Sequence, residues 1–282
     1  MSITFNTYKN MSNDVLQNAV INKVARTSDL LGDIPVEIIN SLMYRFNVSD
    51  YQEELQFVDA GEGFLNGTVE TEAEILELKH LGVYADVPLQ MTYQGSNVAD
   101  LRANVTELKA ENMAKTLETA IFYADGTNKS FKGFNKYIAE GRGTKVAKAI
   151  DYDALCEVVD ACPKANKIYM NRKTLRQVEK ALANEGFVLG SVLNGGETVK
   201  SFNNIPIFDT ETIKDGEIFV LEMSDQGCGL LATGELLNVQ DMGLLDSKPV
   251  YRTMIQGSYA PIVRQPRALA KLEVPLVKTL KK

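Results

Sequence analysis

The chain has 282 residues, of which 45% are hydrophobic and 24% are charged, and its formal net charge is −7. This composition is typical of folded globular proteins, and the length fits one large domain or two. The negative charge argues against a surface that attracts nucleic acid or acidic membranes as a whole. The sequence has no apolar run of about 20 residues and no signal peptide, so we expect a protein made and kept in a cytoplasm.

Residues 1–50 begin with a polar stretch and continue into two predicted short helices. Apolar residues between Val15 and Val24 recur at helical spacing, and Ser12 precedes them as a cap. Pro35 suits the first turn of a second helix, with one apolar face formed between Val36 and Met43. The sequence Leu31-Gly32-Asp33 separates the two. We expect this segment to be an arm that packs on another element.

Apolar and acidic residues alternate between Gln52 and Met91, which predicts strands with one solvent-exposed face. Gly61, Gly63 and Gly67 mark the bend of a long hairpin. A hairpin this long and polar either projects onto a neighbouring molecule or forms the edge of a larger sheet. Its acidic faces favour projection.

The clearest helical pattern lies in residues 97–124, where apolar residues recur every three or four positions. Asn97 can cap this helix and Asp125-Gly126 can end it. At 1.5 Å per residue such a helix spans roughly 40 Å, long enough to run across a whole subunit. Residues 126–143 are predicted to form a loop.

A compact α/β segment is predicted over residues 150–245. Its expected elements are helices at Tyr152–Cys162 and Lys173–Asn184 and buried strands at Lys167–Met170 and Ile218–Leu221, with loops at Gly195-Gly196 and Asn203-Asn204. Residues 250–277 return to strand character, and Pro249, Pro261 and Pro266 restrict these strands to edges or irregular pieces. The last segment is expected to pack with the long helix. The two would then form one discontinuous domain, with the α/β segment inserted in it as a second domain.

No pattern of residues predicts a catalytic or metal site. His80 has no second histidine, cysteine or carboxylate at ligand spacing, and no nucleophile motif accompanies it. The three glycines of the hairpin do not have the spacing of a dinucleotide loop. The carboxylate pairs Glu53–Glu54 and Glu70–Glu72 are most simply a solvated strand face. We therefore assign no catalytic, cofactor-binding or metal-ligating residue.

The remaining reactive and basic groups also have structural interpretations. Cys156, Cys162 and Cys228 are too few for a disulfide framework and are expected to be small core residues in a reducing compartment. The basic tail with Lys278, Lys281 and Lys282 is expected to be solvated, and a local contact with packaged nucleic acid is its alternative function.

Several stretches resemble the major capsid proteins of tailed bacteriophages. The strongest likeness runs from Leu101 to Tyr137, where Ala114-Lys115-Thr116-Leu117-Glu118 and Ala120-Ile121-Phe122 lead into Ala124-Asp125-Gly126-Thr127-Asn128 and then Phe131-Lys132-Gly133-Phe134. This pattern resembles the end of the family's long spine helix and the loop after it. Weaker collinear likenesses are Lys167–Arg172, Ile205–Phe208 and Arg264–Leu269.

The resemblance implies an α+β chain with the Hong Kong 97 capsid fold. In that fold, 1–50 would be the N-terminal arm, 51–92 the extended loop, 93–148 with 246–282 the peripheral domain, and 149–245 the inserted axial domain. The implied function is a non-enzymatic shell protein that forms hexamers and pentamers around double-stranded DNA in the virion, after assembly in the host cytoplasm. The implied partners are copies of itself, a portal and decoration proteins. Because the chain begins almost at the arm, a separate scaffolding protein, or none, is implied. No cofactor and no membrane is implied.

Some members of the family join subunits through a lysine–asparagine bond assisted by a glutamate in the returning strand. Gln256 lies near the position expected for that glutamate, so this cross-link is not expected here. Two other functions stay open: a shell protein of an encapsulin-type bacterial compartment, and an enzyme with an unrecognised carboxylate site.

Overall fold

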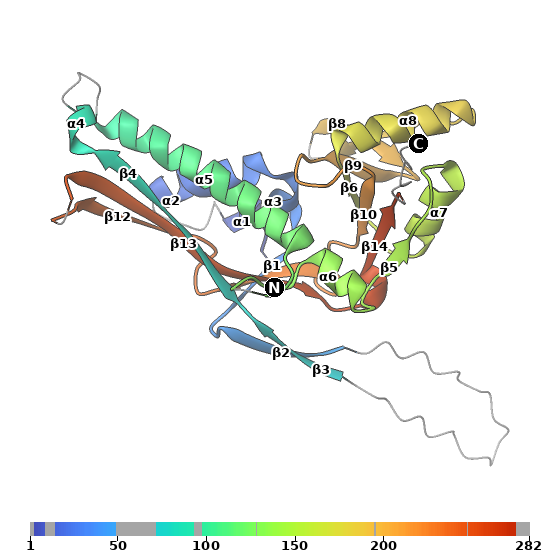
Figure 1. The fold of residues 1–282 in the computed structure, drawn as a ribbon, viewed down its shortest axis with the longest axis horizontal. Helices are drawn as coiled ribbons and strands as arrows, with labels where there is room; N and C mark the ends of the chain where they lie inside the picture. Colours follow the sequence, from blue (N-terminus) through green and yellow to red (C-terminus); the bar gives the residue numbers. More distant parts are fainter. Residues whose placement is uncertain are drawn as a thin grey trace, which may run out of the picture.

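A computed structural model describes residues 3–8, 15–48, 72–92, 98–127, 129–194, 196–246 and 248–274. Two β-sheets with helices packed on them form the body, and a two-stranded ribbon leaves it (Figure 1). This mixture of helices and sheets confirms the predicted α+β class. No helix in the described ranges is long and apolar enough to cross a membrane.

The N-terminal segment contains three helices and then a strand: α1 (Phe5–Tyr8), α2 (Val15–Thr27), α3 (Asp29–Asp33) and β1 (Val36–Ile39). The expected helix starting at Val15 is confirmed, whereas Ser12 lies outside the described residues. The second helix was misplaced: Leu31-Gly32-Asp33 lies inside α3, and the hydroxyl of Ser28 caps α3 by accepting a bond from the Leu31 N–H at 3.2 Å. Residues 36–39 form a strand instead.

The strand β1 forms because three of its four residues are β-branched and a partner strand is available. Val36, Ile38 and Ile39 suit a pleated surface better than a helix. The strand pairs in parallel with β11 (Cys228–Thr233), from Val36 opposite Leu230 to Ile39 opposite Thr233. The arm therefore docks its end as an edge strand of the body.

The first large sheet has five strands in the order β1-β11-β13-β12, with β4 also paired to β13. The added elements are β12 (Asn238–Leu244), β13 (Val250–Val263), β4 (Lys79–Pro88) and the short helix α4 (Leu89–Thr92). The long helix α5 (Val98–Tyr123) contacts β4 and β13 and runs along the sheet (Figure 1). This confirms the predicted long helix, and Gly126 follows its end with a φ of 74°.

One proline lies within the longest strand rather than at its end. Pro261 of β13 is opposite Leu230 of β11, yet β4 pairs with β13 only as far as Tyr259. The N–H of Leu230 points the other way, to the carbonyl of Pro35, so this pair exchanges no backbone hydrogen bond. The prediction that prolines restrict this segment to edges therefore holds at Pro261 itself, where β4 no longer pairs and no strand needs its missing N–H. It does not hold for the whole of β13, which has partners on both sides.

The second large sheet has seven strands in the order β5-β14-β10-β6-β9-β8-β7. They are β5 (Thr144–Val146), β14 (Leu269–Glu273), β10 (Glu217–Leu221), β6 (Lys167–Met170), β9 (Ile205–Asp209), β8 (Glu197–Phe202) and β7 (Gly190–Asn194), and the 3-10 turn η1 (Pro266–Ala268) precedes β14. The helices α7 (Tyr152–Asp160) and α8 (Arg172–Asn184) belong to this unit. The predicted helices and strands of the α/β segment are therefore confirmed.

Local signals account for the starts of these helices. The carboxylate of Asp151 accepts from the Ala154 N–H at 2.7 Å and begins α7, and the amide oxygen of Asn171 accepts from the Lys173 N–H at 2.9 Å and begins α8. Asn203 and Asn204 have φ values of 47° and 68° in the β8–β9 turn, a conformation that asparagine tolerates.

The expected loop over residues 126–143 contains a short helix, α6 (Phe134–Ala139). Its buried residues Phe134, Tyr137 and Ile138 are spaced at three and four positions, but six residues are too few for a sequence pattern to stand out. Tertiary packing stabilises this turn: Phe134 lies edge-on to Phe122 of α5, with ring centroids 6.0 Å apart.

The two sheets exchange strands across the expected domain boundaries. Although β11 and β12 fall within residues 149–245, they pair within the sheet of β13. Conversely, β14 falls within residues 246–282 but pairs with β10 and β5. The division into peripheral and axial domains stays a prediction, and the topology ties the two units together with strands from both.

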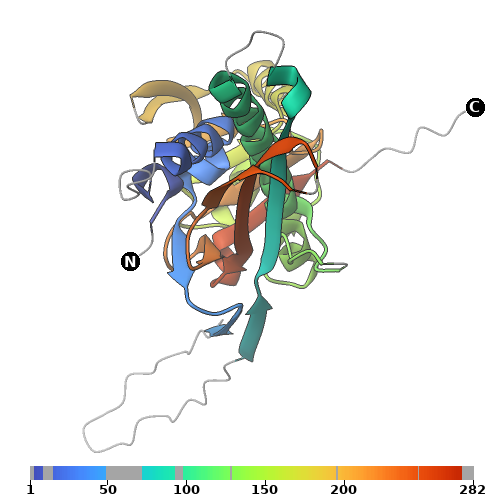
Figure 2. The ribbon, with the colours of Figure 1, turned by 90° about the vertical axis from the view of Figure 1, so that its left-hand side faces the viewer.

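The ribbon consists of β2 (Met43–Val48) and β3 (Glu72–Glu77), which pair antiparallel only with each other. It leaves the body next to the start of β4 in both views (Figures 1 and 2). Of these strands, β3 lies within the segment predicted to form the hairpin, whereas β2 lies in the predicted arm. Residues 79–88 of the same predicted segment form β4 of the first large sheet, so both predicted alternatives, a projecting ribbon and a strand of a larger sheet, apply to different parts of it. The bend glycines Gly61, Gly63 and Gly67 lie outside the described residues.

Candidate functional site

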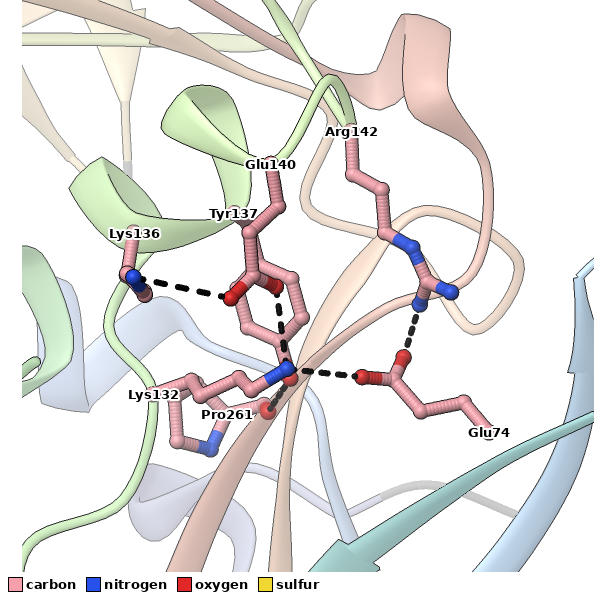
Figure 3. A network of polar contacts seen from close by, with 7 residues as sticks. All are labelled: Glu74, Lys132, Lys136, Tyr137, Glu140, Arg142 and Pro261. Atoms are coloured by element: carbon pink, nitrogen blue, oxygen red, sulfur yellow. Dashed lines mark hydrogen bonds and ion pairs between the residues drawn. The ribbon is translucent and has the colours of Figure 1, made fainter. Parts of the chain in front are cut away.

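The base of the ribbon is held to the body by a cluster of charges that we call the ribbon root: Glu74, Lys132, Lys136, Glu140 and Arg142. Glu74 of β3 pairs with the guanidinium of Arg142 and, at 3.4 Å, with the ammonium of Lys132. Lys132 also pairs with Glu140 at 2.9 Å, which in turn meets Lys136 at 3.7 Å (Figure 3). One carboxylate thus connects the ribbon to two separate points of the loop and helix after α5.

The ribbon root is partly shielded from water, which increases its contribution to stability. The side chains of Glu74 and Arg142 are 12% and 18% exposed. Surface ion pairs contribute about 0–1 kcal/mol, and screening weakens with burial, so this pair lies at the upper end of that range. The geometry fixes the direction in which the ribbon leaves the body.

The cations of the ribbon root are positioned by a close approach between the loop and the end of α5. A Cβ on Gly133 would lie 2.7–2.9 Å from backbone atoms of Ala120, Ile121 and Ala124, so only glycine fits there. The Gly133 N–H donates to the Ala124 carbonyl at 2.7 Å. This contact sets the position of the adjoining Lys132.

A buried phenol fastens the same loop to the first sheet. The hydroxyl of Tyr137 donates to the Pro261 carbonyl at 3.1 Å (Figure 3), and burial raises the pKa of this phenol. The contact also satisfies the carbonyl of β13 at the point where β4 no longer pairs.

A groove of about 450 Å³, lined by both apolar and charged residues, lies beside the ribbon root. Its walls include Phe131 and Pro261 from the body and Met43 and Ile75 from the ribbon. Met43 and Ile75 are each 62% exposed. Such large apolar side chains at the base of a projecting ribbon are typical of a contact surface for another molecule.

A buried lysine, Lys271, joins the second sheet to α5 and α6. Lys271 is only 2% exposed, and its ammonium lies 2.9 Å from Glu217, 3.3 Å from Glu273 and 2.8 Å from the amide oxygen of Asn135. The hydroxyl of Tyr123 donates to the other oxygen of Glu217 at 2.5 Å. Each donor of the ammonium has an acceptor, so the arrangement is that of a buried structural ion network.

A second buried carboxylate lies at the bottom of a cleft of about 650 Å³ between α2, α5 and residues 209–212. Glu118 accepts hydrogen bonds from the hydroxyls of Thr210 at 2.6 Å and Thr212 at 3.0 Å. Burial raises the pKa of Glu118 above its ordinary value. Through these hydrogen bonds Glu118 joins α5 to the segment that follows β9.

His80 has structural partners in the described coordinates. Its ring lies 3.0 Å from the Ser258 hydroxyl and 3.2 Å from the side-chain oxygen of Gln256, across the β4–β13 pairing. No cluster of three or more histidine, cysteine or acidic residues capable of holding a metal occurs within the described ranges. Gln256, which occupies the position near which a cross-linking glutamate was expected, pairs with Gly82 in the sheet and contacts His80.

The other singled-out residues are either in the core or outside the described coordinates. Cys162 and Cys228 are buried and Cys156 is half-buried, and all three are free thiols. Burial raises the pKa of the Cys162 thiol to about 12. The acids Glu53, Glu54 and Glu70 and the tail lysines lie outside the described residues, and only the backbone of Glu72 is described. The ribbon root itself was not predicted, because its partners are about 60 residues apart in the sequence.

Comparison with known proteins identifies the family. The profile of the phage capsid family matches residues 11–229. No curated protein sequence matches the chain. Among solved structures, it resembles the holo-SrpI encapsulin complex from Synechococcus elongatus PCC 7942, with a TM-score of 0.70 and 17% identity over 90% of this chain and 89% of that one.

Two further structures show the same fold. The capsid of the empty GTA particle has a TM-score of 0.65 and 18% identity over 88% of this chain and 90% of that one. The Microbacterium phage Oxtober96 structure has a TM-score of 0.65 and 13% identity over the same shares of the two chains. The fold is therefore the Hong Kong 97 capsid fold, as predicted, and the chain belongs to the phage capsid family.

Proposed function

We propose that this chain is the major capsid protein of a tailed phage, which assembles into hexamers and pentamers that close around double-stranded DNA. Membership of the phage capsid family makes it a capsid shell protein. The observation that carries the finer proposal is the ribbon, because β2 and β3 pair with no other strand of the described residues. A two-stranded ribbon is marginally stable alone, so it needs a surface on another molecule.

The proposed contact is heterologous, with the ribbon of one copy on the body of the next. Repetition of such a contact around an axis closes a ring, which gives the hexamers and pentamers of the proposal. The exposed Met43 and Ile75 and the adjoining groove provide apolar surface that a neighbour would cover. No catalytic role is proposed, because the buried acids Glu118 and Glu217 are held by structural partners.

Assembly takes place in the host cytoplasm in this proposal, with a portal, a separate scaffolding protein and decoration proteins as further partners. The packaged DNA contacts the shell weakly and without sequence preference, which agrees with a net charge of −7. A lysine–asparagine cross-link between subunits is not proposed, since Gln256 contacts His80.

An encapsulin-type compartment shell is the second candidate, and the likeness to the SrpI encapsulin favours it. Expression of the chain alone, followed by electron microscopy and nucleic-acid analysis, tests both. Icosahedral particles that package DNA in the presence of a terminase support the phage capsid, whereas DNA-free spheres that retain a cargo enzyme support the compartment. A stable monomer or dimer under all assembly conditions would contradict both and favour the remaining alternative, an enzyme with an unrecognised carboxylate site.

A variant of the predicted ribbon tip tests the role of the ribbon. Phe64→Asp with Leu65→Asp places two charges where we predict apolar contact with a neighbour, although these residues lie outside the described coordinates. We expect impaired assembly with an unchanged fold by circular dichroism. Normal particles from this variant would refute the function assigned to the tip.

A further inference from the structure

The charges of this chain are divided very unevenly between the ribbon segment and the rest. Residues 46–78 hold nine acids and no lysine or arginine. The remaining residues therefore carry 30 lysines and arginines against 28 acids, a net charge of +2 in a protein whose total is −7. Association of the acidic segment with a basic surface would remove an electrostatic imbalance that the isolated chain retains.

Helix α8 presents a matching row of cations. Arg172, Arg176 and Lys180 are exposed and follow each other at intervals of four residues, so they lie along one face about 6 Å apart. In the part of the chain that the structure describes, none of the three makes an ion pair or a side-chain hydrogen bond. By contrast, the cations of the ribbon root already have acidic partners.

This row is unfavourable for the helix that carries it. Like charges four residues apart destabilise a helix, and the row contains two such pairs. Arg172 and Lys173 occupy the first turn, where no acid is present and where the helix dipole disfavours cations. Positions at which a sequence contradicts the local preference of its own helix are where functional contacts are expected.

We propose that the Arg172–Arg176–Lys180 row of α8 is the docking surface for the acidic ribbon segment, residues 50–70, of a second copy of this chain. The proposal rests on the self-assembly proposed above and names the surface that receives the ribbon. Residues 50–70 hold six of the nine acids and no lysine or arginine, so their charge is complementary to that of the row.

A second copy is favoured as the partner by the direction of the described strands of the ribbon. In both views, β2 and β3 leave the body on the side opposite α8 (Figures 1 and 2). Nucleic acid would also attract the row, but it would not neutralise the six acids of residues 50–70. A contact between copies neutralises both surfaces at once.

Charge reversal in both partners tests the contact. One variant carries Arg172→Glu, Arg176→Glu and Lys180→Glu, a second carries Glu53→Lys, Glu54→Lys and Asp59→Lys, and a third combines all six. We expect each triple variant to lower the fraction of protein in particles about 100-fold or more, and the combined variant to restore it. The matched control reverses three scattered exposed cations, Lys129, Lys164 and Lys248, and is expected to assemble.

A cross-linking readout decides the proposal independently of particle formation. Copies labelled with ¹⁴N and ¹⁵N are mixed and treated with a zero-length carbodiimide, which joins amines to carboxylates. We expect peptides in which Lys180 of one isotope is joined to residues 50–70 of the other, in whatever oligomer forms.

Three results would overturn the docking surface while leaving the proposed function intact. The first is an α8 variant that forms normal particles, and the second is a combined variant that does not regain assembly. The third is an α8 variant whose particles are normal except that they lack nucleic acid. The last would assign the row to packaged DNA. A wild-type chain that forms no particles, yet gives the mixed-isotope cross-link, would instead refute the proposed capsid function and retain the contact between copies.

Discussion

Replacement of the buried Lys271 by methionine is expected to destabilise the body severely. The ammonium is 2% exposed, whereas Glu217, its partner at 2.9 Å, has a side chain that is 11% exposed. Methionine fills a similar volume but leaves the Glu217 carboxylate, among the residues that the structure describes, with the Tyr123 hydroxyl as its remaining partner. Removal of one member of a buried ion pair costs about 3–5 kcal/mol, because an uncompensated charge stays behind.

The matched control is Lys145→Met. Lys145 pairs with Glu273, which also contacts Lys271, but its own side chain is 51% exposed. Surface pairs contribute about 0–1 kcal/mol, so the control should lose less than a third of what Lys271→Met loses. Both are measured by urea unfolding of dissociated subunits.

A double-mutant cycle with Glu217→Gln separates the ion pair from general packing. The combined Lys271→Met and Glu217→Gln variant should recover at least about 1 kcal/mol relative to the sum of the single losses, because neither charge is then buried alone. Additive losses, or a loss below about 1 kcal/mol for Lys271→Met, would show that the network is solvated and that the argument from burial is wrong.

Three further changes address the site. Gly133→Ala should lower the free energy of unfolding, measured in urea, by about 1–3 kcal/mol, because the new methyl group meets the α5 backbone. In the control Gly141→Ala the methyl group meets no atom within 4 Å, so the loss should be smaller and come only from the φ of 83°. Equal losses in the two variants would refute the steric argument. Glu74→Gln should change the free energy of unfolding by no more than about 1 kcal/mol but reduce the yield of particles. An unchanged yield would show that the ribbon root has no role in assembly. Burial raises the pKa of Glu118, so the folded protein binds this proton more tightly than the unfolded chain, and the free energy of unfolding falls as pH rises from 4.5 through the folded pKa. Glu118→Gln should reduce that fall when the free energy of unfolding is measured in urea from pH 4 to 8. The same pH dependence in variant and wild type would contradict the prediction.

The elements that could be predicted are those whose own residues determine them. The apolar spacing in α5 and the buried run of β6 identify a helix and a strand without reference to the rest of the chain. The strand β1 could not be distinguished from a helix, because four apolar-rich residues fit either period and the parallel partner β11 lies almost 200 residues away. The short helix α6 was missed for a similar reason, since Phe122 and Pro261 stabilise it from distant positions.

The candidate site was less predictable than the fold, because it consists of pairs between distant segments. In the sequence, Glu74 is one of several alternating acids on a predicted solvent-exposed strand. The structure distinguishes it from the others because it pairs with Arg142 and Lys132. The prediction that the acidic faces of the hairpin need another molecule uses the same alternation, and it does not identify which acids already have a partner in their own chain.

The unequal distribution of charge bears on how the shell could remain closed without covalent links. Residues 46–78 are strongly acidic while the rest of the chain is slightly basic, so a contact between ribbon and body is attractive and two ribbons repel each other. Repulsion between ribbons disfavours a symmetric ribbon-to-ribbon dimer, which would use up the contact surface without closing a ring. The same acids therefore favour the head-to-tail arrangement that a capsomer requires, and raised salt should weaken that preference before it affects the buried Lys271 network, since screening acts first on exposed charges.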